Sequence, residues 1–171
     1  MTDYEFKPLN ETDLPLMKKW LAAPHLREWW GEPGRQYELI KTDLRDDDID
    51  MRLVQYKGTL IGYIQDYDPG DWPDIHFANL PAGTRATDQF IGEPEMLEKG
   101  HGSAFLRARA EALIAAGAAM VVTDPDAANS RAIAAYRKAG FEEQERFKNK
   151  DSETYGGANK DGTFLLMIYR G

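Results

Sequence analysis

The first half of the chain switches repeatedly between the two-residue period of a strand and the spacing of a helix. Apolar residues alternate over positions 4–9, which predicts a strand that stops near Pro8. Apolar residues then recur three or four positions apart behind a cap at Asn10 or Thr12, and Pro24 is expected to end that helix. Beyond it the pattern predicts an aromatic segment at 26–30, a helix at 37–44, a hairpin of strands 51–56 and 60–67, and a strand at 85–91.

The second half is richer in alanine and begins with a glycine-containing turn. It predicts a long helix that ends near Gly117, a buried strand at 118–123 and a helix at 129–139 that ends at Gly140. Two final strands are expected at 141–147 and 164–169, joined by a polar segment at 149–162. Because strands and helices alternate and a hairpin lies near each end, the fold class is an α/β sandwich rather than an all-parallel doubly wound sheet.

Composition limits the kinds of protein that this chain can be. Its 171 residues, without an internal repeat or a Ser/Pro-rich linker, predict one domain spanning 1–171. Hydrophobic residues make up 42% of the chain, which argues against disorder. There is no cysteine, so disulfides and thiolate nucleophiles are excluded, and His25, His76 and His101 show no metal-ligand spacing. We therefore expect no metal.

Charge and hydropathy favour an acidic protein of the cytoplasm. The N-terminus lacks the pattern of a signal peptide, and the longest apolar stretch, 112–122, is too short to span a bilayer. We therefore expect no membrane association and a cytoplasmic location. The net charge of −8, from 21 basic and 29 acidic residues, disfavours nucleic acid as a partner. An acidic surface attracts cations such as a polyamine or an aminosugar, but it also serves solubility alone.

The first candidate for chemistry is the loop Lys99-Gly100-His101-Gly102-Ser103, between a predicted strand and a predicted helix. Glycines let the backbone approach a ligand, and the first amides of a helix have no acceptors within the helix. With the helix dipole, they form an anion site that suits a pyrophosphate. On this loop alone, a structural turn is an equally good interpretation.

The segment 124–141 carries a more specific pattern, in which Asn129 opens a helix, Tyr136 follows seven residues later, and Gly140-Phe141 leads into a strand. This pattern resembles the signature of the GCN5-related N-acetyltransferases (GNATs). The resemblance implies a mixed, mostly antiparallel central sheet with helices on both faces, and acetyl-CoA as co-substrate without a metal. It also implies a set of cofactor-binding residues, namely Phe90, Ile91, Lys99, Gly100, His101, Gly102, Ser103, Asn129 and Tyr136.

Motifs further upstream narrow the resemblance. The segments 20–21, 24–25, 28–31, 61–67 and 87–90 are similar, in this order, to the aminoglycoside 6′-N-acetyltransferases. This similarity runs from Leu14 to Phe141 and implies a small cationic amine as acceptor, with antibiotic resistance as a consequence. The oligomeric state that we expect is a monomer or a homodimer.

The resemblance also assigns roles, and each residue has a plainer interpretation beside it. An alkylamine has a pKa of about 10.4 and must lose a proton before it attacks, so a base is needed. The resemblance places Asp88 there, although it could be an ordinary strand-end residue, and Tyr136 would protonate the CoA thiolate. Backbone N–H groups of 88–91 would stabilise the oxyanion. Substrate-binding residues would be Trp29, Asp71, Asp88 and Asp124, of which Asp71 could equally be a turn residue and Asp124 a cap.

Two other functions stay open at this point. The segment Ile91-Gly92-Glu93-Pro94-Glu95 also resembles the N-acyltransferases of hydroxamate siderophore synthesis, although Asp88-Gln89 stands where a histidine-containing segment is expected. A CoA-binding sensor that no longer catalyses is the third interpretation. Retention of both Asp88 and Tyr136 argues against it. With no cysteine to carry an acyl group, we expect direct transfer.

Overall fold

A computed structural model describes residues 3–71, 77, 79–148 and 162–171 of the chain. Most of the polar segment predicted to join the last two strands, 149–161, lies outside the described residues, and so does His76. Among the described residues, no helix is long and apolar enough to cross a membrane.

The centre of the fold is a seven-stranded sheet with the order β1-β2-β3-β4-β5-β7-β6. All neighbouring strands are antiparallel except β4 and β5, which confirms the expected mostly antiparallel sheet. The strands are β1 (Tyr4–Pro8), β2 (Ile49–Tyr56), β3 (Thr59–Tyr67), β4 (Thr84–Ile91), β5 (Met120–Thr123), β6 (Glu142–Lys148) and β7 (Thr163–Tyr169).

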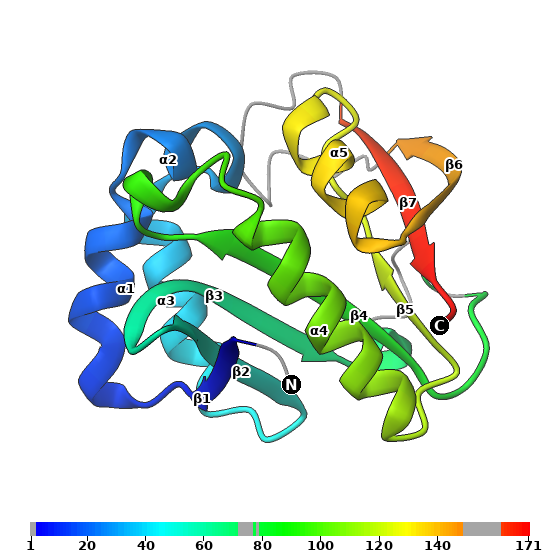
Figure 1. Cartoon of the computed structure of the whole chain (residues 1–171), viewed down its shortest axis with the longest axis horizontal. Helices are drawn as coiled ribbons and strands as arrows, with labels where there is room; N and C mark the ends of the chain where they lie inside the picture. The colour runs from blue at the N-terminus through cyan, green and yellow to red at the C-terminus, as the bar shows by residue number, and fades with distance from the viewer. Residues whose placement is uncertain (1–2, 72–76, 78, 149–161) are drawn as a thin grey trace.

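Helices cover both faces of this sheet, as expected. In Figure 1, α4 crosses the near face and α3 lies behind the strands. The pleat divides the core accordingly: Ile64 packs with Phe105 and Tyr136, whereas its neighbour Tyr63 packs with Trp20 and residues of the opposite layer. The helices are α1 (Leu14–Leu21), α2 (Pro24–Trp30), α3 (Pro33–Asp43), α4 (His101–Ala115) and α5 (Ser130–Ala139), with 3-10 turns η1 (Glu11–Asp13), η2 (Pro69–Asp71) and η3 (Pro94–Met96).

One expectation about the helices is wrong. Pro24 was expected to end the first helix and to be followed by a merely aromatic segment, but it is the first residue of α2. Proline suits this position because its φ is already helical and the missing N–H would have no partner within the helix. Ala23 before it is extended, with φ −66° and ψ 139°, so α1 stops earlier, at Leu21.

The ends of α4 and α5 follow the glycines, as expected. Gly117 and Gly140 both have a φ of 104°, a left-handed conformation that glycine adopts without strain. After α4, the N–H of Gly117 donates to the carbonyl of Ile114 and the N–H of Ala118 to that of Leu113. These bonds keep residues 117 and 118 in the terminating turn, so β5 begins at Met120 and is shorter than the strand predicted over 118–123.

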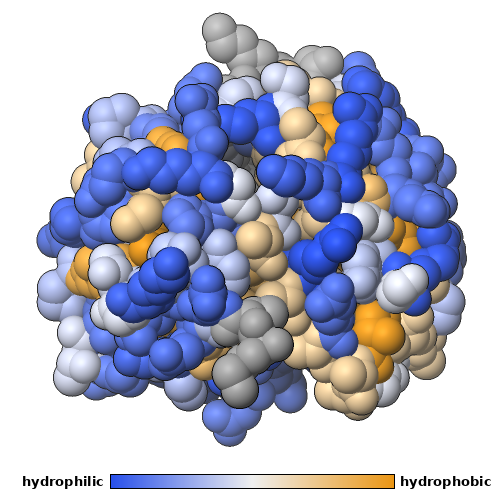
Figure 2. All heavy atoms as spheres, viewed as in Figure 1, coloured by the Kyte–Doolittle hydropathy of each residue, from blue (hydrophilic) through white to orange (hydrophobic). Residues whose placement is uncertain are grey.

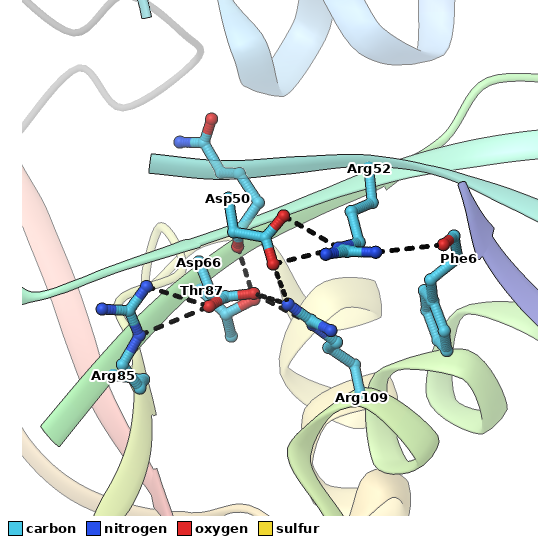
Figure 3. A network of polar contacts seen from close by, with 8 residues as sticks. Phe6, Asp50, Arg52, Asp66, Arg85, Thr87 and Arg109 are labelled. Carbon is cyan, nitrogen blue, oxygen red and sulfur yellow. Dashed lines mark hydrogen bonds and ion pairs between the residues drawn. The ribbon is translucent and has the colours of Figure 1, made fainter. Parts of the chain in front are cut away.

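A network of ion pairs fastens α4 to the sheet (Figure 3). Asp66 on β3 is 2% exposed and accepts hydrogen bonds from Arg109 Nε on α4, at 2.9 Å, and from Arg85 Nη2 on β4, at 3.0 Å. Arg109 Nη2 also donates to Asp50 on β2 at 2.6 Å. Because α4 begins at the glycine loop, this network also positions that loop.

The parallel strands β4 and β5 pair over only part of their length. The register joins Thr84, Arg85 and Ala86 to 120–122, and the rest of β4, residues 87–91, continues without β5 beside it. The two strands diverge beneath α4 and α5 in Figure 1. One edge of β4 is therefore open in the middle of the sheet, where its main-chain groups can meet a ligand.

Candidate active site at the split between β4 and β5

The open edge of β4 presents the backbone of alternate residues. The N–H of Gly92 pairs with the carbonyl of Ile61 on β3 at 2.8 Å, whereas the carbonyl of Ile91 accepts a hydrogen bond from His25 Nε2 on α2 at 2.9 Å. Main-chain groups alternate sides along a strand, so the backbone groups of Gln89 and Ile91 face the split.

A cleft of about 320 Å³ opens at this split. Its walls come from α2, the end of β4, the loop before α4, and α5. The lining residues include His25, Trp29, Trp30, Gln89, Phe90, Ile91, Gly100, Gly102, Ser103, Asn129, Arg131 and Lys138. It therefore gathers seven of the residues assigned to cofactor or substrate binding from the sequence: Trp29, Phe90, Ile91, Gly100, Gly102, Ser103 and Asn129.

The glycine loop has the geometry of an anion site. Gly100 is left-handed, with φ 83° and ψ 1°, immediately before the 15-residue helix α4. A Cβ on Gly102 would lie 3.6 Å from Ile91 Cδ1, so the backbone comes close to the cleft wall here. The first N–H groups of α4 have no acceptors within the helix, and the helix dipole adds positive potential. The loop and the cleft together fit the phosphates of a nucleotide cofactor.

The side chains of His101 and Lys99 do not line this cleft. His101 is buried, its Nδ1 is hydrogen-bonded to the Tyr4 hydroxyl at 2.8 Å, and its ring centroid lies 4.5 Å from that of Tyr56. Burial, with the nearby Lys99 charge, lowers the pKa of His101, which favours the neutral imidazole. The imidazole therefore anchors the loop to the first strands, while Lys99 is exposed.

Asp88 lies on the other side of β4, among hydrogen-bond donors. Gln65 Nε2 donates to Asp88 Oδ2 at 2.9 Å, and the Tyr63 hydroxyl fixes that amide by donating to Gln65 Oε1 at 2.6 Å. Burial, together with the charges of Asp124 and Asp43, raises the pKa of Asp88 to about 7, against the hydrogen bonds from Gln65 and Tyr67, which lower it. A carboxyl with this pKa can accept a proton near neutral pH.

Tyr136 approaches the split from α5. Its side chain is 6% exposed, and its phenol contacts the side chains of Thr123 and Gln89. Burial raises the pKa of Tyr136 well above its usual value of 10, and the charges of Asp88 and Asp124 act in the same direction. The phenol therefore stays protonated and can act as a proton donor. Asn129 caps the same helix, accepting the N–H of Ala132 at 3.0 Å, and lines the cleft.

The residues assigned to binding of the amine substrate lie less close together than those assigned to acetyl-CoA. Asp124 is half-buried directly after β5 and is close enough to Asp88 to raise its pKa. Asp71 ends η2 and is exposed. Trp29, assigned to the substrate, and its neighbour Trp30 are both half-buried and both line the cleft, although Trp30 also packs on Phe90 with ring centroids 4.9 Å apart.

Sequence reasoning missed several residues of the site, namely His25, Gln65, Gln89, Arg131 and Lys138. A signal existed for two of them. Arg131 and Lys138 are seven residues apart on the helix that Asn129 opens, and this spacing places both on one helical face. Lys138 Nζ lies 3.5 Å from the position of a Cβ on Gly100, so a cation stands beside the anion loop. Gln65 had no such signal, because its partner Asp88 is 23 positions away.

Comparisons with known proteins agree with this geometry. Residues 10–149 match a family profile described as "Acetyltransferase (GNAT) domain". The aminoglycoside N(6′)-acetyltransferase type 1 of Klebsiella pneumoniae is 32% identical over 149 residues, which cover 80% of this chain and 72% of that protein. The crystal structure of aminoglycoside acetyltransferase AAC(6′)-Ib with coenzyme A and kanamycin is 27% identical, with a TM-score of 0.77 over 98% of this chain and 94% of that one.

A more distant structure shows how general the fold is. The spermidine N-acetyltransferase from Vibrio cholerae, crystallised with CoA and spermine, has a TM-score of 0.74 over 98% of this chain and 95% of that chain. At 14% identity, this likeness supports the fold alone. The match to the GNAT family profile over residues 10–149 is what assigns the chain to the acetyltransferases. The chain belongs to the GCN5-related N-acetyltransferase family, and it is an acyltransferase that uses acetyl-CoA.

Proposed function

We propose that this protein acetylates the 6′-amine of aminoglycosides, with acetyl-CoA as the donor. The observation that carries the proposal is the pairing, at one split in the sheet, of Asp88, whose pKa is about 7, with Tyr136, whose raised pKa keeps it protonated. The identity of 32% to an aminoglycoside N(6′)-acetyltransferase supports the choice of acceptor.

The donor would be held from its phosphates to its thioester end by residues of the cleft. The amides of the loop at Gly100 and Gly102, with the charges of Arg131 and Lys138, suit the phosphates. Asn129 and the open edge of β4 suit the pantetheine arm. When bound, acetyl-CoA supplies an acetyl group activated as a thioester.

Proton transfer would be divided between Asp88 and Tyr136. Asp88 accepts the proton that the acceptor ammonium must lose before its nitrogen can form the new bond to the acetyl carbon. As the bond from that carbon to sulfur breaks, Tyr136 would give its phenolic proton to the sulfur, and the second proton that the nitrogen loses as the amide forms would restore the phenol. The N–H groups of Gln89 and Ile91 face the split and can stabilise negative charge on the carbonyl oxygen. Because the chain has no cysteine to carry an acyl group, we propose that the acetyl group passes directly from acetyl-CoA to the acceptor amine.

The acceptor site would recognise positive charge. Asp124 lies close enough for its charge to raise the pKa of Asp88, and Asp43 at the end of α3 acts in the same direction. A polycation that binds there relieves this repulsion and gains charge-assisted hydrogen bonds. Trp29 offers a face for a sugar ring, and Asp71 would contribute from η2. We also propose that the enzyme works in the cytoplasm, as a monomer or a homodimer.

The acceptor is tested with a matched pair of antibiotics. Neomycin carries an amine at its 6′ carbon where paromomycin carries a hydroxyl, so only neomycin should release free CoA at the 6′ position when acetyl-CoA is supplied. A thiol assay measures the release, and mass spectrometry locates the acetyl group. Turnover of hydroxylysine but not of neomycin would favour the siderophore pathway instead. No CoA release with any aminoglycoside, polyamine or hydroxylysine would favour a sensor.

We expect Tyr136→Phe to lower kcat by about 10- to 100-fold, towards the lower end for general acid catalysis because a thiolate is a moderately good leaving group. The ring that packs on Phe141, with centroids 5.7 Å apart, is retained, so the affinity for acetyl-CoA should stay within about twofold. Steady-state kinetics and isothermal titration calorimetry separate the two effects.

Tyr169→Phe is the matched control. Tyr169 is also a buried tyrosine that packs on Phe141, with centroids 5.5 Å apart, but it is not part of the cleft lining. Its kcat should stay at the wild-type value. A Tyr136→Phe enzyme that loses its affinity for acetyl-CoA would show that the tyrosine binds the donor instead of protonating it.

A further inference from the structure

One buried polar atom in the cleft has no partner. Gln89 Oε1 is inaccessible to solvent and accepts no hydrogen bond from any residue that the structure describes. Most buried polar side-chain atoms in folded proteins are satisfied, and an unsatisfied one costs about 1–3 kcal/mol. An acceptor left in this state in a ligand cleft indicates that the ligand brings the donor.

The Gln89 side chain points to the face of the sheet on which acetyl-CoA is proposed to bind. Gln89 is the register partner of Ile64, so the two side chains lie on the face covered by α4 and α5. It lines the cleft together with Asn129 and Ala132. Asp88, the next residue along β4, points to the opposite face, where it meets Gln65. A hydrogen-bond donor for Gln89 Oε1 would therefore come from acetyl-CoA and not from the aminosugar.

The other end of the same amide is already engaged. The Gln89 side chain hydrogen-bonds the phenol of Tyr136. Because Gln89 Oε1 has no partner, this bond is made by Nε2, which donates to the phenol oxygen. Oε1 is thus left as a buried acceptor without a partner, on a side chain that lines the cleft. The phosphates and the thioester of acetyl-CoA carry no N–H, whereas its pantetheine arm carries two amide N–H groups.

We propose that Gln89 is a binding residue for the pantetheine arm, with Oε1 accepting one of its amide N–H groups while Nε2 holds Tyr136. The inference rests on the proposed use of acetyl-CoA as donor. It assigns to one side chain both the recognition of the arm and the placement of the tyrosine beside the arm's sulfur end. Binding of the arm completes the hydrogen bonds of an amide that the free protein leaves half satisfied.

This role gives Gln89→Met an unusual pair of effects. Methionine is close to glutamine in length and has no strong polar group to leave unsatisfied. The affinity for CoA should fall about tenfold, because a hydrogen bond of ordinary strength is lost. The free protein loses the unsatisfied Oε1 together with the bond from Nε2 to Tyr136, so it should unfold at about the same temperature as wild type. A residue with a merely structural role would lower the unfolding temperature instead.

A nucleotide without the arm shows where the affinity is lost. Adenosine 3′-phosphate 5′-diphosphate carries the phosphates of CoA but no pantetheine, so wild type and Gln89→Met should bind it equally well by calorimetry. Gln55→Met is the control: Gln55 is also a buried glutamine, 8% exposed, but lies on β2 and is not part of the cleft lining. Its affinity for CoA should equal that of wild type.

Three results would overturn the inference: an unchanged CoA affinity in Gln89→Met, an equal loss of affinity for CoA and for the armless nucleotide, or a lowered unfolding temperature with CoA binding intact. Because these measurements need no acceptor, they are separate from the test of the antibiotic substrate. A chain that binds CoA through Gln89 but acetylates no aminoglycoside keeps this inference and loses the proposed acceptor. A wild-type chain that binds no CoA loses both.

Discussion

Asp88→Asn should lower kcat by about 100- to 10,000-fold, which is the usual contribution of a general base. Asparagine has nearly the same shape but cannot accept the proton of the acceptor ammonium. The wild-type kcat/KM should rise with pH through about 7, the pKa of Asp88, because only the ionised carboxylate acts as a base. The variant should lose this rise. Steady-state kinetics from pH 5.5 to pH 9 with neomycin measure both effects.

A second variant tests the same titration. Gln65→Leu removes the amide whose hydrogen bond lowers the pKa of Asp88, so the rise in kcat/KM should move to higher pH while the maximum stays close to wild type. Asp68→Asn is the control, since Asp68 precedes η2 and its carboxylate accepts the N–H of Gly70 in a turn. An Asp88→Asn enzyme that keeps wild-type activity at every pH would remove Asp88 as the base.

Folding gives a further check on Asp88. Because its folded-state pKa is raised from 3.8 to about 7, the folded protein binds the proton more tightly than the unfolded chain does. Its contribution to stability is therefore present at low pH and is lost as pH rises through about 7. At pH 8 the Asp88→Asn protein should unfold at a temperature no lower than wild type. Lost activity would then reflect chemistry and not misfolding.

Arg109→Met should destabilise the fold by about 3 kcal/mol, since removing one partner of a buried ion pair leaves the other charge insufficiently compensated. Asp66 is 2% exposed and would keep Arg85 alone, and Asp50 would keep Arg52 alone (Figure 3). For a chain of this size, such a loss lowers Tm by about 6 to 12 °C. Differential scanning calorimetry and urea unfolding measure it.

Arg137→Met is the matched control for the buried pair. Arg137 also lies on a helix of the same face and pairs with a glutamate, Glu143, but its side chain is 62% exposed. An exposed pair contributes about 0–1 kcal/mol, so Tm should change by less than about 4 °C. Hydrophilic residues cover much of this face of the molecule (Figure 2). Equal effects of the two substitutions would show that burial does not strengthen the Arg109 network.

Local patterns determined much of this fold. Alternation of apolar and polar residues predicted the first strands, because a half-buried strand places every second side chain in the core, and a short apolar run predicted β5. Gly117 and Gly140 predicted where α4 and α5 end, since a left-handed residue there suits glycine best. Pro24 shows the limit of such signals. A proline both ends one helix and begins the next, and the sequence pattern does not say which.

The sequence indicated one part of the site, and only the tertiary structure revealed the rest. The sequence indicated the acetyl-CoA site through the resemblance of 124–141 to the GNAT signature, in which Asn129 and Tyr136 share one helix face and the glycines at 100 and 102 precede a helix N-terminus. Only the tertiary structure brings the Gln65 amide within hydrogen-bond distance of Asp88 and brings Asp124 close enough to raise the pKa of Asp88. It also leaves Gln89 Oε1 without a partner among the described residues. Desolvation, charge and hydrogen bonding depend on residues that are distant in sequence and meet only when the sheet forms.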